Sequence, residues 1–275
     1  MGFARHAPVG LAVLAAFAIG CNRAEPQLTP EAASAKGDAL LREMSKNMAA
    51  VQTFAYVADE RREQVGAGGA KTERKASRKV IVRRPNGLMF TGSGDSGGTA
   101  AWYDGKHLTL LSDKDKVWAR GPMPATLDEA LDFLGAEYAV RIPTADLLYS
   151  SPYDALITKD TTGGWVDVQK IGDQSCDHLS YHQEVVDWEI WLGPEHHFPC
   201  QLKITYKKDP GQPSTTVTFH GMETSQVTDD TFAAKIPDGY QRIKIMRHAT
   251  VNDPKVEEAP SDPEPPKAPA PPKKK

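Results

Sequence analysis

The sequence predicts an α+β protein in which helices pack on an antiparallel sheet. Apolar and polar residues alternate in short runs, for example at residues 79–82 and 107–110, and this period of two is typical of half-buried strands. Turn sequences separate the runs, among them Pro85-Asn86-Gly87 and Asp104-Gly105, in which glycine tolerates positive φ. Such tight turns join antiparallel neighbours. Other stretches have a helical period instead.

Length and composition favour one main domain and exclude one class of partner. The chain has 275 residues, of which 40% are hydrophobic and 25% charged, so it can bury one large core. Its formal net charge is −3 and its isoelectric point is near 6.3. Proteins that bind nucleic acid through its phosphates need a basic surface. We therefore expect no nucleic-acid partner.

The N-terminus has the pattern of an export signal. Residues 1–20 combine a short polar start, an apolar run at 9–19 and a small residue before Cys21. The sequence Ala18-Ile19-Gly20-Cys21 resembles a bacterial lipobox, although Ala18 replaces the usual leucine. The resemblance implies cleavage before Cys21, acylation of this cysteine and a periplasmic, lipid-anchored protein with a tether at 21–27. Asn22 is not the aspartate that retains many such proteins in the inner membrane, which indicates the outer membrane. An ordinary signal peptide with an unmodified cysteine is the alternative.

Two helix starts are marked by capping residues. Thr29 precedes Pro30, which suits a first helical position because proline lacks the N–H that would remain unpaired there. Thr126 and Glu129 form a capping box, with shorter helical segments expected near 142–149 and 151–156. The central helices carry much apolar surface for their length. They either fill the core or form a movable cover over an apolar cavity.

The remaining apolar runs are expected to be strands, and those between residues 165 and 219 form a meander. They lie at residues 54–65, 165–168, 176–182, 187–192, 201–206 and 216–219, with a final short strand at 241–247. The folded domain is expected to span residues 28–251. Residues 252–275 are rich in proline and lysine and lack an apolar period, so we expect a disordered tail.

Several of these segments are similar to one known group of proteins. The stretches that carry the similarity are Arg83-Arg84-Pro85-Asn86, Tyr103-Asp104-Gly105-Lys106 and residues 126–134, 145–150 and 187–191. They resemble the LolA/LolB-like periplasmic lipoprotein-carrier superfamily and, more narrowly, an uncharacterised family of predicted periplasmic proteins within it. The resemblance implies a strongly curved antiparallel sheet, an incomplete β-barrel, that wraps an N-terminal helix and short central helices. It also implies a concave face able to hold acyl chains, and no catalytic residues.

The residues themselves offer little chemistry. No nucleophile elbow, P-loop, dinucleotide fingerprint or His-Glu-x-x-His motif occurs, so we expect no catalytic residue, no cofactor and no metal. His178 and His182 lie four strand positions apart, about 13 Å, which is too far to share a metal. Cys176 and Cys200 remain as a pair if Cys21 is acylated. An oxidising compartment favours a disulfide between them, and two reduced buried thiols are the alternative.

These expectations lead to two hypotheses of function. The first is a non-enzymatic envelope lipoprotein, tethered to the membrane through Cys21, that binds or carries a lipid or an acyl chain in its concave sheet. The second is an interaction or sensor module that binds another envelope protein and fills its concave face with its own helices. No oligomeric state is predicted. The candidate residues lining an apolar site are Trp102, Leu110, Trp118, Phe133, Leu147, Leu148, Tyr149 and Tyr153.

Overall fold

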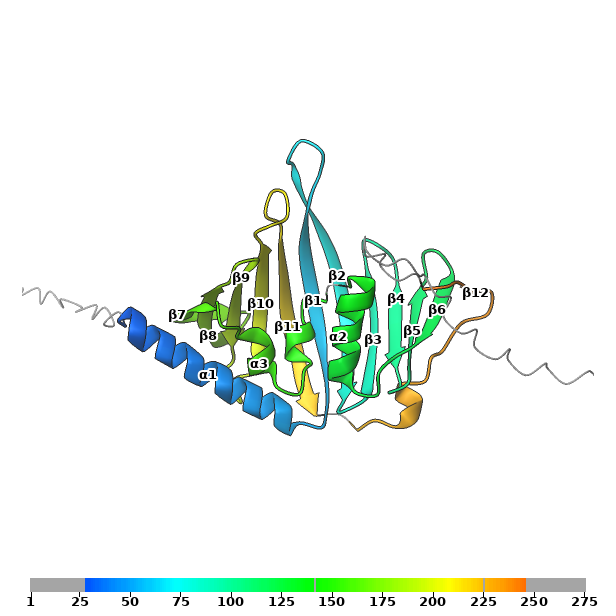
Figure 1. Cartoon of the computed structure of the whole chain (residues 1–275), viewed down its shortest axis with the longest axis horizontal. Coiled ribbons are helices and arrows are strands. Elements are labelled where there is room, and N and C mark those ends of the chain that lie inside the picture. The colour runs from blue at the N-terminus through cyan, green and yellow to red at the C-terminus, as the bar shows by residue number, and fades with distance from the viewer. Residues whose placement is uncertain (1–27, 141, 225, 246–275) are drawn as a thin grey trace, which may run out of the picture.

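The protein is built on one open, curved sheet of 12 strands (Figure 1). The structure, a computed structural model, describes residues 28–140, 142–224 and 226–245. The helices are α1 (Pro30–Ala50), α2 (Leu127–Tyr138) and α3 (Pro152–Leu156), with 3-10 turns η1 (Ala145–Leu147) and η2 (Asp229–Thr231). The strands are β1 (Thr53–Val65), β2 (Lys71–Arg83), β3 (Gly87–Gly94), β4 (Thr99–Tyr103), β5 (His107–Ser112), β6 (Val117–Pro122), β7 (Thr162–Ile171), β8 (Gln174–His182), β9 (Val186–Leu192), β10 (Pro199–Tyr206), β11 (Ser214–Thr224) and β12 (Gln241–Arg242).

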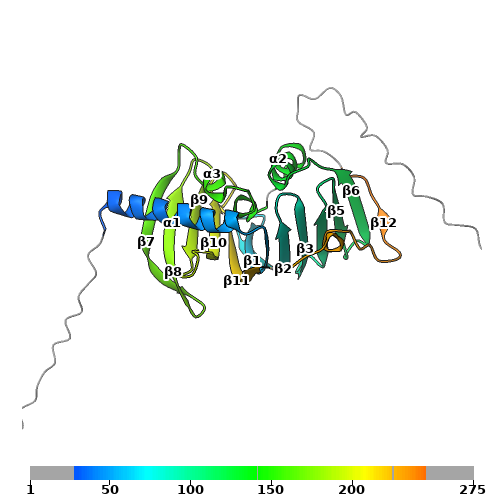
Figure 2. The ribbon, with the colours of Figure 1, turned by 90° about the horizontal axis from the view of Figure 1, so that it is seen from below.

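The strand order confirms the predicted half-barrel. The order is β12-β6-β5-β4-β3-β2-β1-β11-β10-β9-β8-β7, so β12 and β7 form the two edges and the barrel does not close. The pairing of β1 with β11 joins the early meander to the late one. All three α-helices lie on one side of the curved sheet, which we call the concave face (Figure 2). Two alternating runs between residues 79 and 118 predicted two strands. The structure has β3 and β4 in this region as well.

Helix α1 begins where its capping residue predicts and crosses β7 at close range. The side chain of Thr29 accepts a hydrogen bond from the backbone of Ala32 at 3.3 Å. Glycines make the crossing possible. A Cβ added at Gly37 would lie 2.8 Å from the Cα of Gly164, and one added at Gly164 would lie 2.5 Å from the carbonyl oxygen of Ala33. No helix in the described ranges is long and apolar enough to cross a membrane.

The main core lies between the helices and the concave face. Strand residues such as Val80, Val82 and Leu108 are buried there together with Leu41 of α1 and Leu127 of α2. These are the residues whose alternation predicted half-buried strands. Apolar area removed from water at this boundary supplies the main stabilisation of the fold.

The opposite face of the sheet, here the outer face, is covered by the C-terminal segment, residues 226–245. Phe232 is 1% exposed and packs against Ala55 and Ile81. Further along, the segment contacts Trp102 and Trp118. The strand expected at 241–247 is shorter than predicted: β12 comprises Gln241–Arg242, pairs in parallel with β6, and is no further strand of the meander.

The predictions for the two ends of the chain lie outside the described residues. These are the signal peptide at 1–20, the tether at 21–27 with Cys21, and the tail at 252–275. The described part of the chain falls within the predicted domain of residues 28–251. The domain boundaries therefore remain predictions.

We predict that Gly37→Ala destabilises the protein by about 1–2 kcal/mol. Alanine gains about 1 kcal/mol over glycine in a helix, but overpacking costs about 1–3 kcal/mol. Here the new Cβ would also lie 2.7 Å from the hydroxyl of Tyr181. Gly135→Ala in α2 is the matched control, because a Cβ there meets nothing within 4 Å, and it should stabilise the protein. Urea unfolding of both variants checks this, and a stabilised Gly37→Ala protein would contradict the close crossing.

Candidate functional site

A group of short helices lies against the concave face. We call residues 127–140 and 142–156, which include α2, η1 and α3, the helical cover (Figures 1 and 2). Its buried side chains belong to the main core, where they meet the apolar residues of the sheet. They are Leu127, Ala130, Leu131, Leu147, Leu148 and Leu156. The concave face is thus filled by side chains of the cover and of α1.

Hydrogen bonds within the cover join α2 to the segment before α3. The predicted capping box is present, with Thr126 and Glu129 bonded to each other's backbone. The carboxylate of Asp128 accepts hydrogen bonds from the backbone N–H and the hydroxyl of Ser150, the former at 2.9 Å. The hydroxyl of Tyr149 donates to Asp132 at 2.6 Å. The acidic residues at the start of α2, expected there because of the helix dipole, therefore also fix the following loop.

Hydrogen bonds also attach the cover to the rest of the protein. Arg84, beyond the end of β2, donates to the carbonyl oxygen of Leu148 at 2.7 Å. The backbone of Leu127 donates to the carbonyl oxygen of Pro85 at 2.7 Å. At the other end, the backbone of Tyr153 donates to Ser45 of α1 at 3.0 Å.

The side chain of Tyr153 adds a polar connection between α3 and α1. Its hydroxyl donates to Asp38 and accepts from Arg42, the latter at 2.7 Å. Arg42 also pairs with Asp38 at 2.7 Å, and its guanidinium lies 4.0 Å from the centre of the tyrosine ring. The hydrogen bonds from Arg42 and Tyr153 lower the pKa of Asp38, although its partial burial opposes them. The three side chains hold the end of the cover against α1.

Arg84 is a charged residue next to the apolar interior of the cover. Burial lowers the pKa of its guanidinium, and the charge of Asp128 acts in the opposite direction. Its Nε and Nη2 atoms are buried without a hydrogen-bond partner among the described residues. Its guanidinium lies 5.6 Å from the centre of the Phe54 ring. The local sequence does not indicate that Arg84 is buried, because the residue lies between another arginine and a proline.

An acidic pocket of about 350 Å³ opens on the cover. Its walls include the carboxylates of Asp128, Asp132, Asp146 and Asp154 together with Tyr149. Burial raises the pKa of Asp146 to about 6. The described residues contain no group of three or more potential ligand residues able to hold a metal ion. Asp128 and Asp132 are four residues apart in α2 and therefore lie on one helix face, whereas the approach of Asp146 and Asp154 depends on how the cover folds.

The structure divides the eight candidate lining residues between two faces. Leu147 and Leu148 are in the main core, and Leu110, Tyr149 and Tyr153 pack at its edge. Phe133 is half-buried on α2 and meets Tyr138 edge-on at 5.7 Å. Trp102 and Trp118 lie on the outer face, where the C-terminal segment covers them. Both tryptophans are therefore separated from the other six by the sheet. The sequence could not assign their face, because residues on both sides of β4 are buried.

A small apolar cavity lies near the end of α1. It has a volume of about 20 Å³ and is lined by Met48, Val51, Phe54, Phe198 and Met222, with Glu223 at its edge. A volume of this size corresponds to roughly one water molecule. An acyl chain therefore cannot enter the concave face at this place unless the helices move.

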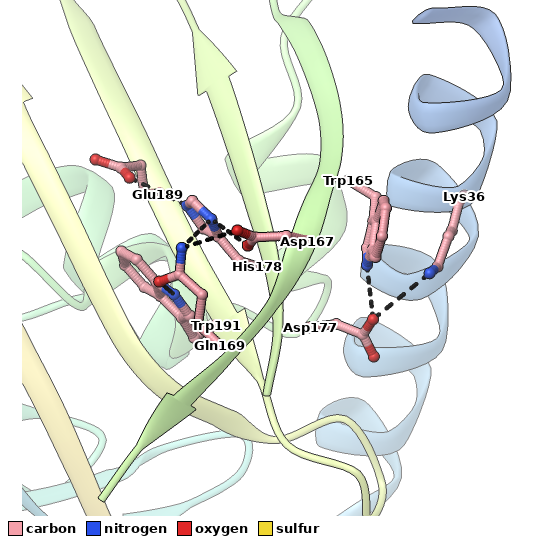
Figure 3. Close-up of polar contacts among 8 residues, drawn as sticks. All are labelled: Lys36, Trp165, Asp167, Gln169, Asp177, His178, Glu189 and Trp191. Atoms are coloured by element: carbon pink, nitrogen blue, oxygen red, sulfur yellow. Dashed lines mark hydrogen bonds and ion pairs between the residues drawn. The ribbon is translucent and has the colours of Figure 1, made fainter. Parts of the chain in front are cut away.

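The outer face of the late strands carries a polar network around His178 (Figure 3). The imidazole lies between Asp167 at 3.0 Å and Glu189 at 3.1 Å and stacks on Trp191 at 4.5 Å. Glu189 also pairs with Lys203 of β10 at 2.8 Å, so the network ties four neighbouring strands together. His182 pairs instead with Asp187 at 3.1 Å. Both histidines thus have carboxylate partners on adjacent strands.

Another group in Figure 3 fixes α1 to the sheet. The indole N–H of Trp165 donates to Asp177 at 2.7 Å, and the ammonium of Lys36 lies 3.4 Å from the centre of the indole ring. Lys36 also pairs with Asp177 at 3.7 Å.

The structure contains a disulfide between Cys176 of β8 and Cys200 of β10. The two strands are separated by β9, so the bond crosses one strand. Cys200 lies at a register shift of β10 between Pro199 and Gln201. At Gly193 an added Cβ would lie 3.4 Å from the sulfur of Cys200, so there is little free space beside the bond.

Comparison with known proteins identifies the family. A family model described as Predicted periplasmic protein (DUF2092) matches residues 37–246, and the chain belongs to this family. This confirms the predicted membership of an uncharacterised family of periplasmic proteins. No curated protein matches the chain.

Several solved structures are similar. An uncharacterized conserved protein from Thermus thermophilus is 9% identical, with 75% of this chain and 97% of that chain covered and a TM-score of 0.44. A LolA superfamily protein from Nitrosomonas europaea is 10% identical, with 72% and 98% covered and a TM-score of 0.34. LprF from Mycobacterium bovis is 10% identical, with 75% and 98% covered and a TM-score of 0.42.

We predict that Asp146→Asn stabilises the protein at pH 7.5 by up to about 2 kcal/mol. The pKa of Asp146 is about 6 in the folded protein, above the value of about 3.9 expected after unfolding. The folded state therefore binds the proton more tightly, and the wild-type protein loses stability as pH rises from about 4 to about 6. Asparagine does not ionise, so its advantage should disappear near pH 4.

The measurement is the free energy of unfolding in urea between pH 4 and pH 7.5. Asp173→Asn, in the exposed turn between β7 and β8, corrects for the change in net charge. A difference between Asp146→Asn and wild type that does not change with pH would show that burial of this carboxyl group is not the cause.

Proposed function

We propose that this protein is a non-enzymatic envelope protein that binds an apolar ligand, such as a lipid or an acyl chain, between its concave sheet face and the helical cover. The observation that carries the proposal is the apolar boundary between the two. Leu131, Leu147 and Leu148 of the cover meet Val80 and Val82 of the sheet in one continuous core. Apolar walls with a few polar groups at the margin are typical of sites for apolar ligands.

The way the cover is attached supports binding by displacement. Among the described residues, the sheet side bonds the cover at Leu127, at Leu148 through Arg84 and at Leu156 through Gln183. Tyr153 bonds it to α1, and a hydrogen bond between Tyr56 and Thr144 adds a contact near its middle. Apolar packing supplies the rest of the attachment. A ligand with apolar chains can replace part of this packing, because the hydrophobic effect depends on the apolar area removed from water. The closed form seen here would then open at α3 or at the loop before it.

The expected anchoring fits this role. We propose that residues 1–20 are a signal peptide, that Cys21 is acylated, and that residues 21–27 tether the domain to the outer membrane. Two or more acyl chains provide stable attachment to a membrane, at about 0.8 kcal/mol per buried CH₂ group. Residues 252–275 would extend from the domain as a disordered tail. The description of the family as periplasmic supports this location.

One observation favours the alternative, an interaction module for another envelope protein. The concave face is occupied by the protein's own helices, and the apolar cavity near α1 measures about 20 Å³. In that function the cover would be a permanent part of the core. The partner would instead bind a sheet edge or the outer surface.

A variant with a weakened attachment of the cover distinguishes between the two functions. We predict that Tyr153→Phe binds the neutral dye N-phenyl-1-naphthylamine about 5-fold more tightly than wild type. The variant loses hydrogen bonds between α3 and α1, worth about 1 kcal/mol in total, and a larger open fraction raises the apparent affinity. Dye fluorescence with protein purified without detergent measures the affinity.

Tyr149→Phe is the matched control. It removes one hydroxyl whose hydrogen bond, to Asp132, lies within the cover, so the attachment to α1 stays intact. It should bind the dye as wild type does. If none of the three proteins binds the dye, and native mass spectrometry finds no lipid in the detergent-free preparation, the carrier function fails and the interaction module remains.

A further inference from the structure

A cleft rich in arginine lies on the same face of the sheet as the apolar core. The hairpin of β1 and β2 extends beyond the neighbouring strands (Figure 1). At its base, next to β3, is a cleft of about 130 Å³. We call it the arginine cleft. The side chains and glycines that define it are Glu60, Arg62, Arg74, Arg78, Gly92 and Gly94.

Strand register places the cleft directly beside the apolar core. On β2, Val82 and Val80 are in the core, and Arg78 follows on the same face two residues further along. On β3, Phe90 packs against the core and Gly92 follows in the same way. Two residues of a strand span about 7 Å. The arginine cleft therefore begins about 7 Å from the last apolar residues of the core, a distance that a small polar group can span.

A buried glutamate holds two of the arginines in position. The side chain of Glu60 is 10% exposed and pairs with Arg62 at 2.9 Å and also with Arg78. Each guanidinium has five N–H donors, so both arginines keep donors for another acceptor. Arg74, which faces Arg62 across the hairpin, donates to the side-chain amide of Gln64 at 3.0 Å. Glu60 is thus a positioning residue for the cleft.

Glycine allows the arginine side chain to lie flat on the sheet. A Cβ added at Gly92 would be 2.7 Å from Cγ of Arg78, so the stem of this arginine passes over the glycine. A Cβ added at Gly94 would be 2.4 Å from the carbonyl oxygen of Lys75. Because neither position has room for a side chain, Arg78 and the backbone of β2 lie in direct contact with β3 at the wall of the cleft.

The arginines of the cleft exceed its carboxylates. Among the described residues that line it, Glu60 is the one carboxylate, opposite three arginines. Other acidic residues of the hairpin are engaged elsewhere: Asp59 pairs with His220, Glu63 with Lys71 and Glu73 with Lys75. Asp95, in the turn after β3, accepts from the backbone N–H of Lys75. The cleft therefore has a positive field that favours an anion.

We propose that the arginine cleft binds the phosphate group of an amphiphile whose apolar chain enters the concave face. This inference rests on the proposed function for the chain, whereas the phosphate site depends on the cleft alone. Several guanidinium groups around one hollow suit phosphate, which accepts charge-assisted and bidentate hydrogen bonds. The volume equals about four water molecules at roughly 30 Å³ each, enough for a phosphate group and too small for an acyl chain.

We predict that the full chain binds dodecyl phosphate about 10-fold more tightly than the neutral 1-dodecanol, and that it also binds inorganic phosphate weakly. The preference should be lost in the double variant Arg62→Gln/Arg74→Gln, because charge-assisted hydrogen bonds contribute about 1.5–3 kcal/mol each. This variant keeps the pair between Glu60 and Arg78. Isothermal titration calorimetry at two salt concentrations measures the affinities, which should fall with salt.

The matched control is Arg61→Gln/Lys79→Gln. These residues lie on β1 and β2 of the same hairpin, neither lines the cleft, and strand alternation places their side chains on the opposite face. The control removes the same charge and should leave the preference for phosphate unchanged. Melting temperatures of both double variants check that each is folded.

Each outcome decides between the two proposals. If Arg62→Gln/Arg74→Gln prefers dodecyl phosphate as strongly as wild type, or if wild type binds neither phosphate compound, the cleft is not a phosphate site. If wild type binds inorganic phosphate through these arginines, but neither dodecyl compound gains affinity from its chain, the phosphate site stands and binding of an apolar ligand fails. Arginine-dependent tight binding of dodecyl phosphate supports both.

Discussion

The fold depends on the apolar side chains of an open sheet, which other elements must cover on both faces. A closed barrel buries its interior with its own strands, but this sheet ends at β7 and β12 and needs other elements. On the concave face, α1 and the helical cover supply the buried side chains. On the outer face of the early strands, the C-terminal segment does so through Phe232 and the residues after it. The cover and the segment therefore belong to the fold as much as the strands do.

Much of this arrangement could be predicted from local signals. Thr29 and Thr126 marked two helix starts, because capping is a property of four neighbouring residues. The positions of Val80 and Val82 beside the charged Lys79 and Arg83 indicated their face, although Ile81 between them is apolar and is buried on the outer face. The family could also be predicted, since its motifs are runs of consecutive residues.

The rest depends on contacts between distant segments. Trp102 and Tyr103 are both buried, one under the C-terminal segment and the other in the main core, so no alternation separates their faces. Residues 226–245 have no apolar period, and their packing on the outer face follows from single anchors such as Phe232. The acidic pocket and the arginine cleft bring together residues from several elements. The sequence shows the types of these residues. Which of them lie on the same face could be known only from the strand register and the packing of the helices.

If the proposed ligand binds in the concave face, the charges of the acidic pocket and the arginine cleft favour one orientation of its head group. Acidic groups surround the pocket on the cover, whereas arginines surround the cleft at the base of the hairpin. Between them lies the apolar core, where the deeply placed cation of Arg84 is already bonded to the cover. An anionic group is repelled by the carboxylates and attracted by the arginines. An amphiphile in this face would therefore place its head at the hairpin and its chain beneath the cover, which links displacement of the cover to recognition of the head group.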